Sequence, residues 1–584
     1  MNKDYTRATV RSWVALRLRR YWKPMSLILL MQAIGALLGS LQPILFQRIV
    51  ALVVAKYASF PIREGLRLLG ALALVYLIGS LLQGAGGYVG SLFSCDMLRQ
   101  LQVDFFDKMI RLPLQTLQKQ SAGEMFTRFS ADTSQTQRFL VSFIPSLIRD
   151  LLTALVVTVI LLIGCPLALT ATALSIIVIT GCLTAMLHSV MERFARTQRE
   201  QYGAINALLD ETFQGIDTLK TLASEGRRRH GFERLARDFR DLSVKAGTVG
   251  ASFSSALDLL TKFGGVLLLF LAYRLIAHGK IGTAPFLLFF FYSGMLQMTT
   301  SSLVYSLTSF QSQLVGLRNV ARFLMEPVEE DVPEQHAGFE IAKSVAIEVM
   351  RLTFAYPEKN LLFRDACLLA PARGTTLIHG PSGSGKSTLI NLILGFYSPT
   401  QGTVLFGGVP INKITRSELR RKLGVVTQDH FIFSETLRDN VRIARHDAGE
   451  DQIRDALRRA HLDGLVQRLP GGLDYRLDPR GKGLSAGERQ RICIARVLLR
   501  DSPIMLLDEP WSNLDDEARQ ILACVINECR TRKTVVITSH EDIPCLKVDR
   551  VYRLVPETGS FVQENRDGTS FDWNRHALQP AAKG

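Results

Sequence analysis

Residues 380–388 read Gly380-Pro-Ser-Gly-Ser-Gly-Lys386-Ser387-Thr388 and fit the pattern G-x-x-x-x-G-K-[ST]. An apolar run, Thr375 to Ile378, precedes this stretch, and a second apolar run, Leu389 to Leu394, follows it, so we expect a strand, a loop and a helix in that order. Glycines let successive backbone N–H groups point into one concavity, and the helix N-terminus adds partial positive charge. The stretch therefore predicts a loop that binds a triphosphate.

The polar residues of this loop have separate expected tasks. Lys386 would reach the β- and γ-phosphates of ATP as a compact charge, and Ser387 would offer its hydroxyl to Mg²⁺. The residues expected to bind the nucleotide in this loop are Gly380, Ser382, Gly383, Ser384, Gly385, Lys386, Ser387 and Thr388.

Two further apolar strands are expected to end in polar residues. The run Ile504 to Leu507 ends in Asp508-Glu509, where one carboxylate can face Mg²⁺ and the other the attacking water. The run Thr534 to Thr538 ends in Ser539-His540, and His540 could hold the leaving phosphoryl group and orient the water. The alternatives are solvent-facing acids at a strand end and a structural histidine.

The composition divides the chain into two halves. Apolar residues make up 47% of the 584 residues, and the uncharged runs concentrate before residue 320. The formal charge of +16 does not indicate nucleic acid, because no basic patch is interleaved with aromatic residues. The eight cysteines lack C-x-x-C spacing and are expected to be reduced, mostly buried thiols.

Uncharged stretches predict six membrane spans. Each of the first two, Met25 to Gln47 and Leu68 to Cys95, exceeds the roughly 20 residues that cross a bilayer. Leu151 to Met191 is expected to form two spans that turn at Gly164-Cys165-Pro166. The fifth span is expected near residues 251–273 and the sixth within residues 281–317, and two charged connections, 96–140 and 192–245, read as helices that extend into the cytosol.

The expected organisation is multidomain, with an all-α six-helix transmembrane domain followed by an α/β P-loop ATPase domain. The basic, aromatic start of the chain suits a cytoplasmic membrane surface, and an even number of spans puts both termini and the ATPase domain on that side of the inner (cytoplasmic) membrane. The expected boundaries are a basic interfacial segment (1–24), a transmembrane domain (25–325), a linker (326–345), a nucleotide-binding domain (346–565) and a polar tail (566–584).

The later half resembles the nucleotide-binding domain of ABC transporters. Leu484-Ser485-Ala486-Gly487-Glu488 is similar to the family's LSGGQ signature, and Ser512-Asn-Leu-Asp515 is similar to its D-loop. The resemblance implies that Tyr356 stacks on adenine, that Gln428 lies in the Q-loop as a catalytic residue and a Mg²⁺ ligand beside Ser387 and Asp508, and that Glu509 and His540 are catalytic.

The earlier half resembles the family's exporter-type (type IV) transmembrane domain. Residues 112–132 are similar to its first coupling loop and residues 211–220 to its second, so the chain looks like a half-transporter. The resemblance implies a dimer, in which Ser485 and Gly487 of one chain close over the ATP bound by the other. A homodimer would contain two complete ATP-binding sites, and the sequence also allows a heterodimer.

Several positions depart from the family pattern. Ala486 replaces a glycine and Glu488 a glutamine, and both are expected to be tolerated. Pro479 stands where exporters usually carry a glutamate and has no charge to contact a coupling loop. The way in which movement of the ATPase domain is transmitted to the transmembrane domain is therefore expected to differ in detail.

The leading function hypothesis is an ATP-driven exporter or flippase. Few charges lie inside the predicted spans, and Asp258 and Lys262, four residues apart, can neutralise each other, so an amphipathic small molecule, lipid or peptide is the expected cargo. The alternatives are an importer of a siderophore-like compound and a nucleotide-gated regulatory subunit.

Overall fold

The computed structural model describes residues 13, 19–55, 62–120, 122–278, 282–329, 345–357, 360–512, 514–541, 545–564 and 570–571. They form two compact units, Met1–Arg111 with Gln120–Glu326, and Leu112–Lys119 with Pro327–Gly584. Most of the predicted interfacial segment, most of the predicted linker, Asn513 of the D-loop-like stretch and most of the polar tail lie outside the described residues.

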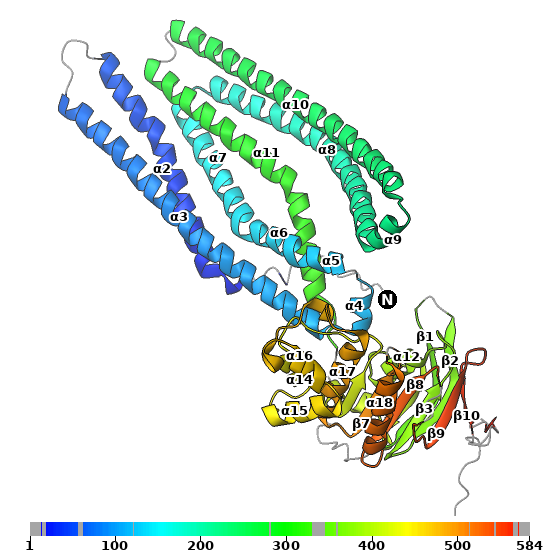
Figure 1. Ribbon diagram of the computed structural model, residues 1–584. Helices are drawn as coiled ribbons and strands as arrows, with labels where there is room; N and C mark the ends of the chain where they lie inside the picture. The colour runs from blue at the N-terminus through cyan, green and yellow to red at the C-terminus, as the bar shows by residue number, and fades with distance from the viewer. Residues whose placement is uncertain are drawn as a thin grey trace, which may run out of the picture. The chain divides into compact units, whose positions relative to one another are not determined.

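The first unit consists of helices throughout its described part (Figure 1). Helix α2 packs on α3 and α7, α11 packs on α7, and α8 runs beside α10. The segment that leads into α7 is helical with two π-helical turns, η1 and η2. The elements are α2 (Trp22–Ala55), α3 (Ile62–Arg111), α5 (Ala122–Thr127), η1 (Arg128–Asp132), α6 (Thr133–Arg138), η2 (Phe139–Phe143), α7 (Ile144–Gly164), α8 (Leu167–Gln214), α9 (Ile216–Thr221), α10 (Glu225–Ala277) and α11 (Thr283–Met325).

Five of these helical stretches are long and apolar enough to cross a membrane, within the described residues. They are Trp22–Val53, Ile62–Arg111, Gly123–Gly164, Leu169–Leu187 and Glu225–Ala277. Helix α11 is 43 residues long but is not among the five, so the sixth span stays a prediction.

The predicted turn between the third and fourth spans is confirmed. Helix α7 ends at Gly164, Cys165 takes an extended conformation, and α8 begins directly after Pro166. Proline fits the start of a helix because the first N–H groups there have no helical partner.

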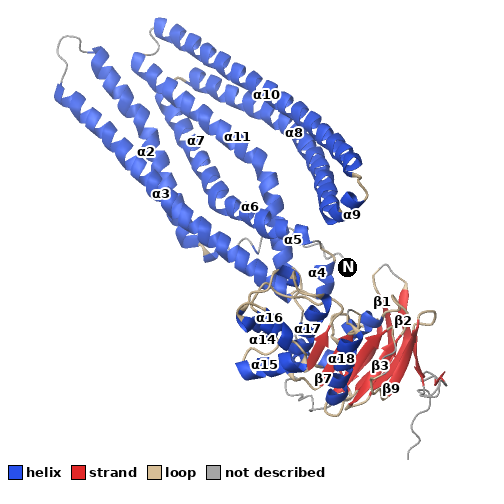
Figure 2. Cartoon of the chain, viewed as in Figure 1, coloured by secondary structure: helices blue, strands red, loops and turns tan. Residues whose placement is uncertain are grey.

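The second unit is built on two sheets (Figure 2). A seven-stranded sheet has the order β11-β10-β9-β3-β8-β7-β6, and its strands β9, β3, β8, β7 and β6 pair in parallel. A four-stranded antiparallel sheet has the order β2-β1-β4-β5. The strands are β1 (Ile347–Ala355), β2 (Leu361–Ala370), β3 (Gly374–His379), β4 (Gln401–Phe406), β5 (Val409–Pro410), β6 (Leu423–Val426), β7 (Ile504–Asp508), β8 (Thr534–Ser539), β9 (Arg550–Val555), β10 (Ser560–Glu564) and β11 (Ser570–Phe571).

Helices cover the parallel strands. The longest, α17, packs against α14, α15 and β6. The helices of this unit are α4 (Leu114–Gln118), α12 (Lys386–Ile393), α13 (Arg416–Arg421), α14 (Leu437–Arg442), α15 (Glu450–Arg459), α16 (Asp463–Arg468), α17 (Ala486–Arg500) and α18 (Asp516–Cys529), with short 3₁₀ turns η4 (Ile411–Lys413), η5 (Gly472–Asp474) and η6 (Pro479–Gly481).

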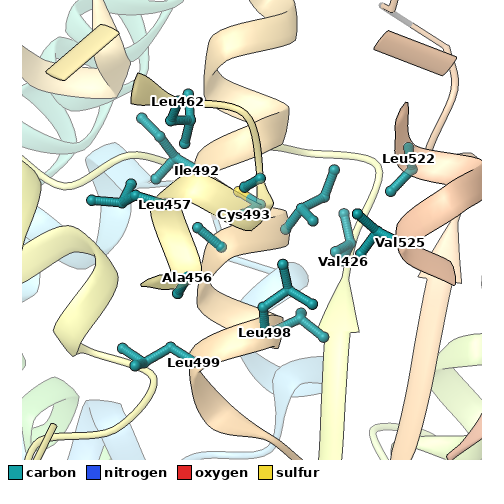
Figure 3. Close-up of a cluster of buried hydrophobic side chains, with 14 of the residues drawn as sticks. Val426, Ala456, Leu457, Leu462, Ile492, Cys493, Leu498, Leu499, Leu522 and Val525 are labelled. Carbon is teal, nitrogen blue, oxygen red and sulfur yellow. The ribbon is translucent and has the colours of Figure 1, made fainter. Parts of the chain in front are cut away.

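Successive side chains of the parallel strands enter two different hydrophobic cores. Met505 and Leu507 of β7 pack with α15, α17 and α18, whereas Ile504 and Leu506 pack toward α12 and the antiparallel sheet. Figure 3 shows the first core, where Leu457, Ile492 and Leu522 come from three helices. Because neighbouring strand residues point to opposite faces, the parallel strands are buried on both sides.

The cysteine prediction is half right. All eight cysteines, each of them described, are free thiols, but only Cys165, Cys493 and Cys529 are buried. Cys95, Cys182, Cys524 and Cys545 are exposed. The error arises because the first two of these exposed cysteines lie on long helices of the first unit, whose outer faces are not covered by protein.

Gly402 in β4 is expected to tolerate no side chain. A Cβ there would lie 2.2 Å from the Arg351 carbonyl oxygen, and its φ of +79° is left-handed. We expect Gly402→Ala to destabilise the second unit by about 2 kcal/mol or more. The fluorescence of Trp511, which is only 2% exposed in this unit, reports the thermal midpoint.

The matched control is Gly464→Ala in α16. A Cβ at Gly464 meets no atom within 4 Å, and alanine favours a helix over glycine by up to about 1 kcal/mol. An equal drop in the midpoint for both variants would contradict the steric argument.

Candidate functional site

The predicted triphosphate loop joins β3 to α12, as expected from the sequence. Gly383 and Gly385 have φ angles of +78° and +109°, a region that favours glycine. A Cβ at Gly383 would meet nothing within 4 Å, and Gly385 is the N-cap of α12. The loop therefore leaves open space where its backbone turns toward the start of the helix.

Three of the predicted site residues contact one another. Nζ of Lys386 lies 3.4 Å from Oε1 of Glu509, and Nδ1 of His540 lies 3.6 Å from the same oxygen. Lys386 is almost fully buried and its ammonium group also donates to the carbonyl oxygens of Gly380 and Pro381, at 2.8 and 3.0 Å. The side chain of Glu509 is 14% exposed and that of His540 is 43% exposed. Water can therefore reach the Glu509 carboxylate from the side on which His540 lies.

The parallel sheet brings these residues together. Strand β8 lies between β3 and β7, with His379 beside Ser539 and Asp508 beside Thr538. The chain leaves all three strands at the same edge, because carboxyl ends of parallel strands meet there. The loop after β3, His540 after β8 and Glu509 after β7 are neighbours for this reason.

Asp508 and Glu509 differ in their surroundings. Asp508 is 4% exposed, and the hydroxyl of Thr538 donates to its Oδ1 at 2.6 Å. Glu509 has a φ of +47°, and its N–H donates to the Thr538 carbonyl oxygen at 3.0 Å. A left-handed glutamate stores backbone strain, which occurs preferentially at functional sites. The turn directs Glu509 to Lys386 while Asp508 stays at the strand end.

The residues present fit a magnesium–nucleotide complex. The hydroxyl of Ser384, within the loop, is buried without a hydrogen-bond partner in the described part of the chain, so a phosphate oxygen could accept from it. Ser387, Asp508 and Gln428 supply hard oxygen atoms, the donors that Mg²⁺ prefers. No group of three or more His, Cys, Asp or Glu residues suited to a metal ion occurs among the described residues.

The predicted adenine-stacking residue Tyr356 reaches the end of the loop. Its hydroxyl lies 3.0 Å from Oγ1 of Thr388, and its ring lies 5.2 Å from that of Tyr397 in an edge-to-face arrangement. The hydroxyl of Tyr397 donates to Oε1 of Gln118 in α4, and Nε2 of Gln115 donates to the Phe396 carbonyl oxygen at 3.3 Å. Burial, followed by the charge and hydrogen bond of Tyr356, raises the pKa of Tyr397, so the phenol stays a donor.

The signature-like segment starts α17. Ser485 is the N-cap, with its hydroxyl accepting from the N–H of Glu488 at 3.1 Å while Glu488 Oε2 accepts from the N–H of Ser485 at 2.8 Å. The helix begins at Ala486. Gly487 lies in its first turn, and the exposed Ser485 keeps its O–H free to donate to another group.

Glu488 has a second partner, which the sequence did not reveal. Nη2 of Arg468 lies 2.7 Å from its Oε1. Burial alone would raise the pKa of Glu488, but the backbone N–H of Ser485 and the charge of Arg468 outweigh it, so the pKa lies below its usual range. The carboxylate thus stabilises the helix start at neutral pH, and this contribution disappears as the pH falls through the lowered pKa.

The remaining predicted residues are not joined to this cluster. Gln428 lies two residues after β6 and is exposed. Within the described part of the chain, no hydrogen bond or ion pair connects Ser485 or Gly487 with the loop at residues 380–388. The roles of the site residues therefore stay predictions.

Sequence reasoning missed several residues of the site. The Thr538 hydroxyl donates to the Asp508 carboxylate, and its carbonyl oxygen accepts from the Glu509 N–H. The available signal for Thr538 was its position at the end of an apolar strand. Tyr397 and Gln118 are 279 residues apart, and nothing local links them, although Gln118 lies in the stretch that resembles a coupling loop.

Two family models match different parts of the chain. The model described as ABC transporter transmembrane region matches residues 25–300, and the model described as ABC transporter matches residues 365–512. Together they span both units.

Similar proteins and a similar structure agree with these matches. A fatty acid ABC transporter ATP-binding/permease protein of Mycobacterium bovis is 29% identical over 84% of this chain and 77% of its own length. An ATP-dependent lipid A-core flippase of Chromobacterium violaceum is 25% identical over 95% of this chain and 94% of its own length. The structure of a bacterial Atm1-family ABC exporter with ATP bound matches with a TM-score of 0.79 and 23% identity, over 93% of this chain and 95% of that one.

The fold is accordingly that of an ABC exporter, with a helical transmembrane domain followed by an ATPase domain that couples ATP hydrolysis to transport. The chain belongs to the ABC transporter superfamily, as an exporter-type (type IV) half-transporter.

Proposed function

We propose that the protein is an ATP-driven exporter or flippase of amphipathic molecules that works as a homodimer. The observation that carries this proposal is the contact of Glu509 with both Lys386 and His540, in a chain that also contains membrane-crossing helices. A regulatory subunit that binds ATP without hydrolysing it would have no use for a carboxylate aimed at the phosphate-binding lysine.

The site residues divide the chemistry among them. Lys386 and the loop N–H groups would hold the phosphates, and Tyr356 would stack on adenine. Glu509 would accept a proton from the attacking water, and His540 would orient that water. Mg²⁺, held by Ser387, Asp508 and Gln428, would neutralise charge on the phosphates.

A second chain would complete each site. The start of α17 offers N–H groups and the Ser485 hydroxyl, which suit a phosphate. Because Lys386, Ser485, Glu509 and His540 all occur in one chain, two copies supply two complete sites. A heterodimer remains an outcome that mixing experiments with tagged copies would detect.

The membrane unit contains a space suited to an amphipathic cargo. A cavity of about 1290 Å³ lies among α2, α3, α8, α10 and α11. Its wall includes Phe46, Tyr76, Phe289 and Met298, and its charged member, Lys262, pairs with Asp258 at 2.7 Å. The pairing expected from the sequence is therefore present. Two of the relatives, the fatty acid transporter and the lipid A-core flippase, are named for amphipathic cargo as well.

The proposed orientation places the ATPase domain and both termini in the cytoplasm, with the helices in the inner membrane. ATP is available on that side, and the basic residues near the start of the chain favour the same side.

Glu509→Gln tests the catalytic assignment. We expect phosphate release to fall by about 10²–10³-fold because the proton acceptor is lost, while binding of a fluorescent ATP analogue persists. Glu541→Gln is the matched control, since Glu541 also contacts His540, at 3.5 Å, but not Lys386. The control should keep most of the turnover. Unchanged phosphate release in Glu509→Gln would refute the assignment.

Transport is measured with inside-out vesicles and a fluorescent single-chain amphiphile. Export predicts ATP-dependent accumulation inside the vesicles for the wild type and none for Glu509→Gln. ATP-dependent loss from preloaded vesicles would instead show import.

Tyr397→Phe tests the link between the nucleotide site and α4. The variant keeps the ring contact with Tyr356 but loses the hydrogen bond to Gln118, a loss of about 1 kcal/mol. We expect amide exchange in residues 114–118 to rise about fivefold, as measured by mass spectrometry. Tyr552→Phe removes another hydroxyl of this unit, one that donates to the Leu369 carbonyl oxygen, and should leave exchange in α4 unchanged. Equal exchange in Tyr397→Phe and the wild type would contradict this link.

A further inference from the structure

A second cavity adjoins the large one and differs from it in character. It measures about 560 Å³, lies along α2 and α3, and is lined largely by small residues and by the amides of Gln32, Gln42 and Gln83. One charged side chain, Arg149 of α7, lies in its wall. An ionisable group on a membrane-crossing helix is costly and is found mainly where it has a function.

Arg149 is held by a buried partner. Its Nε and Nη2 donate to Oδ1 of Asp150 at 2.9 and 2.8 Å, and the side chain of Asp150 is only 7% exposed. The other oxygen of Asp150 accepts from the hydroxyl of Ser302 in α11. Both oxygens of the carboxylate are therefore engaged, and the two bonds to Oδ1 fix the guanidinium plane.

The arrangement leaves donors of Arg149 unused. Its Nη1 has no partner among the described residues, and the side chain is 44% exposed. The Asp150–Arg149 pair presents its positive end to the cavity, where a planar acid group can accept from it.

Gln32 supplies an independent sign of a ligand. Its Oε1 is buried with no hydrogen-bond partner in the described part of the chain, and Gln32 lines the same cavity as Arg149. A buried acceptor without a donor costs about 1–3 kcal/mol, so a hydroxyl or N–H on a bound molecule would stabilise this site.

The two cavities share part of their walls. Gly39, Gln42 and Tyr76 line both, so a molecule can extend from the polar space into the apolar one. The larger space offers aromatic and methionine side chains, and Asp258 already neutralises its Lys262.

We propose that the cavity at Arg149 is the headgroup subsite of an amphipathic anion, whose acid group binds Arg149 and whose apolar body occupies the larger cavity. This inference rests on the proposed transport of amphipathic molecules and narrows the cargo to those with an acidic head. A cationic head would be repelled, and a neutral head would leave the Nη1 donors of Arg149 without an acceptor.

Binding of three probes of equal chain length tests the proposal. Hexadecanoate, hexadecanol and hexadecyltrimethylammonium compete with a fluorescent fatty acid on the full-length protein in phosphatidylcholine nanodiscs, without ATP. Because a hydrogen bond to a charged group is strong, hexadecanoate should bind about tenfold or more tightly than hexadecanol. Equal binding of the acid and the alcohol would overturn the proposal.

Two variants separate ligand binding from a structural role. Removing Arg149 alone would leave Asp150 buried and unpaired, so the double variant Arg149→Gln/Asp150→Asn removes both charges. We expect it to bind the acid and the alcohol equally. Asp150→Asn alone should keep or increase the preference for the acid, because the cation is no longer neutralised. A merely structural pair would make both variants change the preference in the same direction, which would overturn the proposal.

Lys262→Gln is the matched control. It removes a cation from the adjoining cavity and should keep the preference for the acid. If Lys262→Gln abolishes the preference and the double variant keeps it, the subsite at Arg149 is refuted.

The source of the acid is decided in the same assay. Phosphatidylglycerol in the nanodisc displaces hexadecanoate from the wild type if the subsite takes a membrane lipid, and leaves it bound if the subsite takes single-chain acids. Either result supports an anionic headgroup. Because these measurements use no ATP, a failure of vesicle transport would contradict the proposed function and leave the subsite standing.

Discussion

The parallel pairing of β3, β8 and β7 is the constraint on which the candidate site depends. Asp508 and Glu509 are adjacent in sequence, and only the register of β7 against β8 decides which one stays at the strand end beside Thr538. A slip of one residue would exchange the two and turn every side chain of β7 to the opposite face. The two hydrophobic cores on either face prevent this slip, because Met505 and Leu507 belong to one core and Ile504 and Leu506 to the other.

The start of α17 shows why an unusual signature residue is compatible with the fold. Glu488 closes a capping box with Ser485, and this pairing needs only a side chain that can accept at the third position of the helix. The negative charge adds a favourable interaction with the helix dipole and with Arg468. Pro479 likewise opens a 3₁₀ turn before the signature, where its fixed φ suits the first position. Both departures from the family pattern thus have a local structural reason.

How much the sequence predicts depends on the distance over which a residue finds its partner. The loop at residues 380–388, the turn at Gly164 to Pro166 and the ion pair of Asp258 with Lys262 all follow from neighbours within a few positions. The contact of Lys386 with Glu509 required the order of the strands, which a motif implies only through its family. The contact of Tyr397 with Gln118 has no local signal. The exposure of Cys95 and Cys182 was also missed, because burial on a membrane helix depends on which face meets other helices.

The two ion pairs of the membrane unit illustrate the same difference. Asp258 and Lys262 lie one turn apart on α10, so helix geometry alone brings them together, and both side chains remain exposed. Arg149 and Asp150 are adjacent, so their side chains leave the helix in different directions, and Asp150 becomes buried only because α11 packs against α7 and supplies Ser302. How strongly Asp150 neutralises the Arg149 guanidinium therefore depends on the packing of α11 against α7, and not on the geometry of α7 alone. A shift of α11 along α7 would remove a hydrogen bond from Asp150 and change how strongly the carboxylate neutralises the cation at the cavity wall.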